Sequence, residues 1–587
     1  MTTNRDVLAM LSELITLTTL EEESPQSFKV RAYENAKLAI ESHGDDVTGL
    51  TIAQLTKIQG VGKATASKIR ELVDGGVVEK IETLRSKYPP EFVEMSRIPG
   101  IGPKTLKLIR TELAVENVDA LRQAIVDEKL RTLPGLGETS EAKIAKAIDR
   151  LGLTGKDRRT PIADALPLAE RLVADLMDLK AVSNAVYCGS LRRMSETIGD
   201  IDITVSSTKP TEVMKAVVSH TEVADIVVSG DTKTSFLTSS GLQVDVRVVA
   251  PEQFGAATMY FTGSKAHNIA LRQRAIDRNM LLNEYGLIDT SDEDLEGDDR
   301  PVIASETEQE IYAALDLSYV PPPMRENTGE VDRAATDGFD QLVQREHIRG
   351  DLHYHTDRSG DGRSSVEDMV QVAVDHGYDY LAITDHGVDL AINGSTAEEM
   401  LEHRDHITRV QEAHPQMQIM WGCELNIDPK GGLDYDDDFR ALFDYTVASV
   451  HSSYDQTPVK QTDRLVNAIS DPTVNSIGHL TGRYIGRRPG IELEVKPLLE
   501  ALLHYDVALE INGALQRLDA ASDVVRQAVD AGVKLVINTD SHHTSELGRM
   551  EYGIRTAQRG WAPKDLVVNT WEPDRFMNWV AGRADRV

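Results

Sequence analysis

GSLRRMSETIGDIDITV, residues 189 to 205, joins a Gly-Ser turn and two arginines to a run in which apolar and polar residues alternate. That alternation, with β-branched residues at every second position, is typical of a β-strand. Because successive strand side chains point to opposite faces, Asp200 and Asp202 share one face while the isoleucines beside them enter the core. Neighbouring carboxylates repel each other unless a cation lies between them. The stretch therefore predicts a strand with a divalent-metal site on one face.

A second acidic strand and the Gly-Ser turn extend this site. In LQVDVRVV, residues 242–249, Asp245 interrupts another apolar alternation. The turn, Gly189 and Ser190, offers backbone N–H groups and a hydroxyl to phosphate oxygens. Three carboxylates on two neighbouring strands can hold two Mg²⁺ or Mn²⁺ ions, one for a 3′-hydroxyl and one for a nucleoside triphosphate. The alternative is a solvated strand with ordinary surface aspartates, which leaves the turn, the arginines and the second strand unexplained.

Length and composition limit the class of protein. At 587 residues the chain is too long for one core, so several domains are expected. We find neither an apolar run of membrane-spanning length nor the basic start and apolar run of a signal peptide, so no membrane contact is expected. The two cysteines, Cys188 and Cys423, are too few for a disulfide framework and favour a reducing cytoplasm.

The charge is strongly negative but unevenly distributed. A net charge of −32 argues against a nucleic-acid binder at first sight. However, 18 of the 23 lysines lie at or before Lys265, whereas 13 of the 16 histidines lie from His347 onward. An acidic, lysine-poor surface suits a cytoplasm of very high salt, where charges are screened within a few ångströms. We therefore hypothesise a halophilic, archaeal source, and we distinguish a lysine-bearing front part from a histidine-rich back part.

Three segments near the N-terminus share the pattern apolar-x-Gly-apolar-Gly before a helical stretch: Ile58–Gly62, Ile98–Gly102 and Leu133–Gly137. The glycines allow a tight turn, and the following helix begins with free N–H groups that suit a nucleic-acid phosphate. Such contacts bind DNA without reading its sequence. The third hairpin is followed by Glu138, which favours a structural role. The predicted DNA-binding residues of the first two are Gly60, Gly62, Lys63, Gly100, Gly102 and Lys104.

Metal-ligand residue types recur from residue 347 onward. His353 and His355 form an H-x-H pair, which places both imidazoles on one side of a strand. The other candidates end or follow short apolar runs that alternate with helical segments, as in an α/β barrel whose ligands gather at the C-terminal strand ends. They are Asp361, His386, Glu424, His451, His479, Asp540 and His542. Nine such ligands fit two or three Mn²⁺ or Zn²⁺ ions. We expect His376, His403, His406, His414 and His504 to lie in the core or on the surface, and His543, beside His542, either to support the ligands or to lie exposed.

The front part resembles the small N-terminal domain of family X DNA polymerases. The resemblance covers FKVRAYENAKLAI and GVGKATASKIRELVDGGVVEKIETL, which begin at Phe28 and Gly60. It implies that Lys68 forms a Schiff base with an abasic sugar, a role that nearby cations favour by lowering the pKa of a lysine. The alternative is that Lys68 only contacts DNA. The residues that match the family's 5′-phosphate site are Tyr33, Lys29 and Lys80.

The opening stretch resembles the catalytic palm of the same polymerase family. The resemblance implies that Asp200, Asp202 and Asp245 are the catalytic metal ligands. It also continues through FGAATMYFTGSKAHNIALRQRAIDRNMLLNEYGL, which matches the family's thumb. An aromatic pair on a turn is suited to packing on the nucleotide sugar. The implied nucleotide-binding residues are Gly189, Ser190, Arg193, Tyr260, Phe261, Gly263 and Asn268.

The back part resembles the polymerase and histidinol phosphatase (PHP) domain over residues 347–570. Fused to a family X polymerase, such a domain implies Mn²⁺-dependent 3′-5′ exonuclease, 3′-phosphatase or abasic-site endonuclease activity. The family pattern H-x-H-[ST]-x-x-S-D-G is altered here, because the chain reads HTDRSGDG from His355. Either Asp361 binds metal through a shifted loop, or Asp357 takes its place.

The predicted fold is therefore multidomain, with helical helix-hairpin-helix domains, an α+β nucleotidyltransferase palm and thumb, and a distorted TIM-like α/β barrel. The expected divisions are 1–85 (lyase-like), 86–155 (fingers-like), 156–250 (palm), 251–318 (thumb), 319–346 (linker) and 347–587 (PHP). The predicted function is a DNA-directed DNA polymerase that fills short gaps in repair and carries a second phosphoesterase site. We expect it to bind gapped or primer-template DNA and deoxynucleoside triphosphates as a monomer. The alternatives are a DNA-binding phosphoesterase whose polymerase half only positions substrate, a small-molecule phosphatase, or another nucleotidyltransferase of the superfamily.

Overall fold

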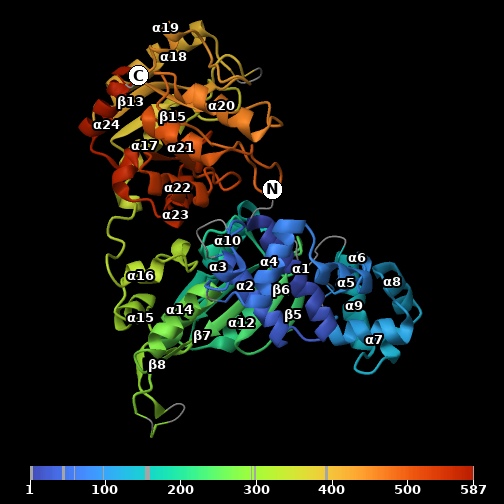
Figure 1. Cartoon of the computed structure of the whole chain (residues 1–587). Helices are drawn as coiled ribbons and strands as arrows, with labels where there is room; N and C mark the ends of the chain where they lie inside the picture. Colours follow the sequence, from blue (N-terminus) through green and yellow to red (C-terminus); the bar gives the residue numbers. More distant parts are fainter. Residues whose placement is uncertain are drawn as a thin grey trace.

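The computed structural model describes residues 4–41, 47–58, 60–96, 98, 100–151, 159–292, 294–295, 299–390 and 394–585. Figure 1 shows the chain as helices followed by a mixed sheet, an extension of helices and hairpin strands, and a C-terminal lobe. None of the described helices is long and apolar enough to cross a membrane.

The front helices share one apolar core, which runs from Val7 to Ile148. The hairpin glycines Gly60 and Gly100 have φ of +101° and +92°, which favours glycine, and Gly62 and Gly102 cap the following helices. The same apolar core contains residues on both sides of residue 85. The expected division between two domains at this residue stays a prediction. The helices are α1 (Asn4–Glu22), α2 (Phe28–Glu41), α3 (Ile52–Leu55), α4 (Lys63–Gly75), α5 (Glu79–Lys87), α6 (Pro90–Met95), α7 (Pro103–Leu113), α8 (Val118–Val126) and α9 (Glu138–Leu151).

The palm is a five-stranded sheet with the strand order β2-β4-β7-β6-β5. Strand β4 (Asp200–Ser206) lies beside β7 (Gln243–Val249) in parallel, and Asp202 is directly opposite Asp245. Ile201, Ile203 and the other apolar residues of β4 are buried, as their alternation predicts. The remaining elements are β1 (Thr160–Pro161), α10 (Ile162–Met177), β2 (Asn184–Tyr187), α11 (Gly189–Arg192), β3 (Thr197–Ile198), α12 (Pro210–Val218), β5 (Asp225–Ser229) and β6 (Lys233–Leu237).

The thumb follows as α13 (Phe254–Thr262), α14 (Lys265–Ile276), β8 (Met280–Asn283), β9 (Gly286–Asp289), β10 (Val302–Ala304) and α15 (Glu308–Ala314). Tyr260 and Phe261 lie in the last turn of α13, not on the turn where the sequence analysis placed them. The segment expected as a linker contains η4 (Pro322–Met324) and α16 (Glu330–Ala334), and its Val320 and Leu342 belong to the thumb core.

The C-terminal lobe is a seven-stranded, all-parallel sheet in sequential order that is nearly closed into a barrel. A parallel bridge between Tyr354 and Ser541 joins its first and last strands. The strands are β11 (Gly350–Tyr354), β12 (Tyr380–Ile383), β13 (Gln418–Asn426), β14 (Tyr445–Ser449), β15 (Ser476–Ile477), β16 (Ala508–Asn512) and β17 (Leu535–Asn538). The helices are α17 (Val366–Asp375), α18 (Ala397–Ala413), α19 (Asp437–Arg440), α20 (Pro458–Ile469), α21 (Val495–His504), α22 (Ser522–Ala531), α23 (Met550–Arg559) and α24 (Pro573–Ala581).

The barrel packs directly against the palm and thumb. Leu515 and Leu518, which follow β16, belong to the apolar core of the palm. Helix α23 lies on the side of the C-terminal lobe that faces the rest of the chain (Figure 1). Its Arg559 donates to Glu326 at 2.7 Å and to the backbone carbonyl of Arg193 at 2.8 Å. The two halves of the chain are therefore in contact through residues close to both predicted sites.

Candidate metal centres

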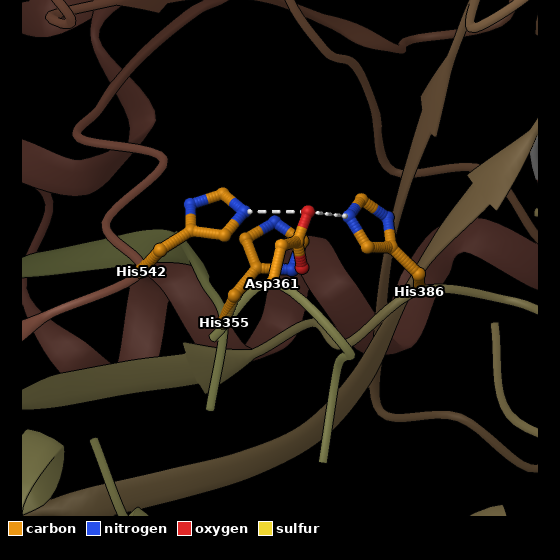
Figure 2. Close-up of side chains that lie close together, drawn as sticks. All are labelled: His355, Asp361, His386 and His542. Carbon is orange, nitrogen blue, oxygen red and sulfur yellow. Dashed lines mark ion pairs between the residues drawn. The ribbon is translucent and has the colours of Figure 1, made fainter. Parts of the chain in front are cut away.

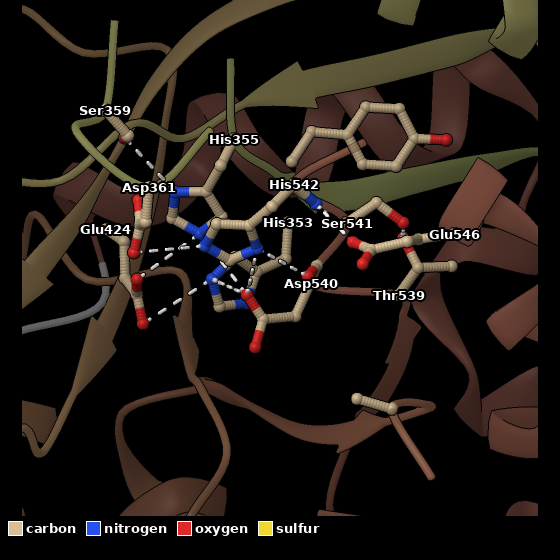
Figure 3. A network of polar contacts seen from close by, with 12 residues as sticks. His353, His355, Ser359, Asp361, Glu424, Thr539, Asp540, Ser541, His542 and Glu546 are labelled. Atoms are coloured by element: carbon tan, nitrogen blue, oxygen red, sulfur yellow. Dashed lines mark hydrogen bonds and ion pairs between the residues drawn. The ribbon is translucent and has the colours of Figure 1, made fainter. Parts of the chain in front are cut away.

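The predicted metal ligands of the barrel lie together at the C-terminal ends of its strands. A network of polar contacts joins several of them (Figure 3). The set comprises His353, His355, Asp361, His386, Glu424, His451, His479, Asp540 and His542. This is where the parallel strands of an α/β barrel bring side chains from distant parts of a chain together.

The ligand atoms form three overlapping groups, each with atoms within 4.8 Å of one another. His355, Asp361, His386 and His542 form the first (Figure 2). The others are His353, His355 and Asp540, and His386, Glu424 and His451. Shared histidines join the groups, which is the arrangement of a cluster of neighbouring ions rather than of one isolated ion.

Orphaned polar atoms show that these residues fit a metal cluster. Within the described chain, Nε2 of His353, Nε2 of His355 and both carboxylate oxygens of Glu424 are buried without a hydrogen-bond partner. Buried polar groups are normally satisfied, because an unpaired one costs about 1–3 kcal/mol. Imidazole nitrogen and carboxylate oxygen are ligands for Mn²⁺ and Zn²⁺.

Asp361, and not Asp357, lies in the cluster. Oδ2 of Asp361 is 3.4 Å from Nε2 of both His386 and His542. Asp357 is exposed, and its backbone N–H donates to the carbonyl of Ser364. Asp361 therefore reaches the cluster although it lies one residue later in the chain than the aspartate of the family pattern.

Burial and charged neighbours shift the pKa values of the cluster's residues in both directions. Burial raises the pKa of Glu424, but the surrounding histidines, His451 and His353 foremost, outweigh it and hold that pKa well below its usual range. Burial, together with His542 and His386, lowers the pKa of His355 to about 4. The pKa of His386 is instead raised to about 10, because Glu424 and Asp361 outweigh burial, so this ring would lose a proton when a metal binds.

Sequence reasoning missed two supporting carboxylates. Glu510 accepts a 2.7 Å hydrogen bond from Nδ1 of His353, and so orients the ring. Asp385 accepts hydrogen bonds from Thr356 and Ser359 and lies 2.8 Å from His403. Each acid interrupts an apolar strand or strand end, in LEIN and AITDH, which is the only local signal of a buried role.

The palm carboxylates occupy neighbouring strands, but their oxygen atoms do not lie as close together as the ligand atoms of the histidine cluster. Nζ of Lys233 lies 2.8 Å from Asp245, and Gln243 donates to the same side chain at 2.8 Å. These bonds outweigh burial and lower the pKa of Asp245, whereas burial, with Asp200 and Asp245, raises the pKa of Asp202 to about 7. In the described chain, the compact sets of ligand atoms are those of the histidine cluster, not of this triad.

The predicted phosphate-binding turn lies against this triad. Gly189 has φ of +62°, and a Cβ there would lie 2.7 Å from Oδ2 of Asp202. Ser190 follows in α11 and is half-buried. Arg193 donates to the carbonyl of Thr262 at 2.7 Å and pairs with Glu326 at 3.0 Å, so the turn also contacts the thumb.

The thumb residues predicted to bind the nucleotide form one group. The rings of Tyr260 and Phe261 meet edge to face with centroids 5.0 Å apart, and Asn268 donates to the carbonyl of Tyr260 at 2.8 Å. The guanidinium of Arg247, two residues after Asp245, lies 4.5 Å from the Phe261 ring. Gly263, with φ of +67°, lies beside Arg193. The thumb group and the triad therefore share one side of the palm.

The predicted lyase residues also lie together. Nζ of Lys68, on α4, is 6.0 Å from the centre of the Tyr33 ring, and Lys29 pairs with Glu22 at 2.7 Å. Lys80 is exposed at the start of α5. The hairpin residues Gly60, Gly62, Lys63, Gly102 and Lys104 are exposed, as is Gly100, so DNA phosphates can reach them.

Family comparisons agree with this arrangement. Residues 2–78 match a helix-hairpin-helix domain, 92–150 a SAM-like helix-hairpin-helix tandem, 257–326 a DNA polymerase beta thumb and 351–514 a PHP domain. The chain is 35% identical to the DNA polymerase/3′-5′ exonuclease PolX of Bacillus subtilis (strain 168) over 569 residues, which are 96% of this chain and 97% of that protein. The chain belongs to the PolX family. Family and fold class are therefore as the sequence predicts.

Part of this PolX chain also resembles smaller proteins. It is 26% identical to a probable phosphatase of Acetivibrio thermocellus over 245 residues, 40% of this chain and 97% of that protein. A probable phosphatase of Thermoanaerobacter sp. (strain X514) is 26% identical over 230 residues, 38% of this chain and 89% of that protein. Each of these matches covers less than half of this chain.

Proposed function

We propose that the chain is a DNA-directed DNA polymerase that fills short gaps in repair. The observation that carries this proposal is the direct opposition of Asp202 and Asp245 on parallel strands, with the Gly189 turn packed against Asp202. Family membership supports it, since the Bacillus subtilis relative is named a DNA polymerase.

Different residues would bind the metal ions, the triphosphate and the sugar during nucleotidyl transfer. Divalent ions such as Mg²⁺ or Mn²⁺, held by Asp200, Asp202 and Asp245, would supply positive charge to the 3′-hydroxyl and the triphosphate. The Gly189-Ser190 turn would donate hydrogen bonds to the β and γ phosphates, and Arg193 would leave Glu326 to add a charged donor. Tyr260 and Phe261 would position the sugar.

We propose that the histidine cluster is the 3′-5′ exonuclease site. Two or three Mn²⁺ or Zn²⁺ ions there would neutralise the phosphodiester and supply a nucleophile near neutral pH. The chain's contribution is to hold the ligands rigidly, with Glu510 fixing His353 and Asp385 fixing the loop before Asp361. The same chemistry would serve 3′-phosphates or abasic sites.

A gapped DNA with a labelled primer tests both proposals. With Mn²⁺ and deoxynucleoside triphosphates the primer should lengthen until the gap is filled. Without deoxynucleoside triphosphates it should shorten by one nucleotide at a time. Shortening with no lengthening under any metal or salt condition would instead support the alternative, a DNA-binding phosphoesterase whose polymerase half only positions substrate.

We propose Lys68 as an abasic-site lyase residue, because it lies beside Tyr33 as the family resemblance implies. Borohydride should trap the wild-type protein on DNA with a 5′-abasic sugar, but not the Lys68→Ala variant. Trapping of Lys129→Ala serves as the control, since Lys129 is an exposed lysine of the front part that lies outside the hairpins. If Lys68→Ala is trapped as well, Lys68 only contacts DNA.

The proposed partners are gapped or primer-template DNA and deoxynucleoside triphosphates, bound by a monomer. The exposed hairpin glycines and lysines support DNA binding. The scarcity of cysteine supports a cytoplasmic location.

A further inference from the structure

Arginine and tyrosine side chains form a continuous stack beside the histidine cluster. The guanidinium of Arg488 lies between the rings of Tyr454 and Tyr484, 4.3 Å and 4.7 Å from their centres. Arg517 lies 4.5 Å from the centre of the Tyr484 ring and donates to its hydroxyl at 3.1 Å. Each contact is a cation–π interaction, which holds a guanidinium flat against a ring.

One end of the stack reaches a metal ligand, and the other end lies close to a ligand in the sequence. Nε of Arg517 lies 3.5 Å from Oδ2 of Asp540, a residue of the cluster drawn in Figure 3. At the other end, Tyr454 follows the ligand His451 by three residues. The stack therefore forms part of the wall of the metal site.

The two stacked arginines keep donors for a ligand. Arg488 donates through Nε and Nη2 to the carbonyl of Gly482, and within the described chain its Nη1 makes no hydrogen bond and it has no ion pair. Nη1 of Arg517 likewise has no hydrogen-bond partner among the described residues. Guanidinium N–H groups that are fixed in direction but unused are suited to phosphate oxygens.

The segment that carries Tyr484 and Arg488 is unusually positive for this chain. Residues 472–491 contain three arginines and no carboxylate, although the whole chain has 95 acidic and 63 basic residues. The segment is also fixed to the palm, because Arg483 donates to Glu196 at 2.8 Å and Ile485 packs on the palm core. Glu196 lies in the stretch between the Gly-Ser turn and Asp200, so the positive segment contacts the part of the chain that joins these two features.

We propose that Tyr454, Arg488, Tyr484 and Arg517 form a binding subsite for the backbone phosphates of a single DNA strand whose 3′ end enters the histidine cluster. This inference rests on the proposed exonuclease function. The strand must be unpaired, because His353, His355 and Glu424 are at most 1% exposed and a duplex end cannot reach them. Arg517, next to Asp540, contacts the phosphate nearest the cluster, and Arg488 contacts a phosphate further along the strand.

The test compares Arg488→Gln with the matched control Arg575→Gln. Arg575 is also an arginine on an aromatic ring, 3.8 Å from the centre of Trp571, on helix α24 outside the stack. The substrates are an oligothymidylate of about 12 nucleotides and the p-nitrophenyl ester of thymidine 5′-phosphate, which is too short to reach Arg488. Both are hydrolysed with Mn²⁺, and binding of the oligothymidylate is measured by anisotropy without metal at several salt concentrations.

Arg488→Gln should raise KM for the oligothymidylate about tenfold with kcat unchanged, and should leave hydrolysis of the nucleotide ester unchanged. The salt dependence of binding should fall by about 0.7 in logarithmic slope, as for one lost phosphate contact on a single strand. Arg575→Gln should match wild type throughout. Arg488→Lys, which keeps the charge but loses the flat stack, should restore the slope but only part of the KM.

Two results would overturn the inference separately from the proposed function. If wild type hydrolyses both substrates and Arg488→Gln has the KM and salt slope of wild type, there is no subsite at the stack. Equal loss of activity on the ester and on the oligothymidylate would assign Arg488 a structural role in the cluster. If wild type hydrolyses neither substrate, the exonuclease function itself is wrong.

Discussion

The backbone of Gly189 has φ of +62°, and any side chain there would meet the Asp202 carboxylate. Gly189→Ala should therefore displace Asp202 and reduce kcat/KM for primer extension by about 10²-fold, as expected for a shift of about 1 Å in a reacting group. Exonuclease activity should be unchanged. Steady-state extension of a gapped DNA measures the effect.

Gly199→Ala is the matched control, since the space around its Cβ is open and its φ is not in the left-handed region. It lies in the same stretch, next to Asp200. If both variants extend as wild type does, close packing of the turn on Asp202 is not needed for nucleotidyl transfer.

Glu510 holds the other site by orienting a ligand. Because its carboxylate accepts from Nδ1 of His353 at 2.7 Å, Glu510→Gln should weaken Mn²⁺ binding about 10- to 100-fold. Calorimetric titration with Mn²⁺ measures this, with the exposed Glu500→Gln as the control. Equal affinity in the two variants would show that Glu510 does not support the cluster.

At the level of residues, the sequence identifies the metal ligands better than the side chains that orient those ligands. Histidines and aspartates that end apolar runs could be recognised because strand ends meet at one face of a barrel. Glu510 could not, because its partner His353 is 157 positions away and one acid in a strand does not reveal its contacts. The pairing of Lys233 with Asp245 depends in the same way on the register of β6 and β7.

Helix α15 joins the thumb to the palm through a buried carboxylate. Glu308 pairs with Arg192 at 2.8 Å and with Arg325 at 2.5 Å. Glu308→Ala leaves two arginines without their partner and should lower the free energy of unfolding by about 3–5 kcal/mol. Chemical denaturation measures this, and the exposed neighbour Glu306→Ala should lie close to wild type. Equal stability of the two variants would contradict a structural role for the pair.

The same group gives a pH dependence. Burial raises the pKa of Glu308, but Arg325 and Arg192 outweigh it and lower the pKa to about 2. A lowered pKa contributes stability that is complete above the ordinary value of 4.5 and lost as the pH falls towards 2. The stability difference between wild type and Glu308→Ala should therefore shrink over that range.

Elements with a clear period were predictable, and a largely buried helix was not. The alternation in β4 and the strand-helix repeats of the barrel both appear in the structure. Helix α13 has buried residues from Gly255 to Thr262, so it lacks the polar face that marks an amphipathic helix. The Thr-Gly-Ser sequence at the end of the helix is typical of a turn, and for this reason Tyr260 and Phe261 were predicted to lie on a turn.

For the whole molecule, the net charge of −32 predicts a dependence on salt. Self-repulsion destabilises a highly charged compact state, and screening within about 3 Å at 1 M salt removes it. If the source is halophilic, the melting temperature should rise steadily with KCl, and extension should persist at molar concentrations. Full stability and activity in dilute buffer would contradict this hypothesis.

The central claim is that one chain holds two separate metal sites, one that adds nucleotides and one that removes them. The most direct measurement follows a labelled primer on gapped DNA with Asp245→Ala and His353→Ala. Asp245→Ala should lose extension and keep degradation, whereas His353→Ala should lose degradation and keep extension. Extension by Asp245→Ala at the wild-type rate, or degradation untouched in His353→Ala, would contradict the claim.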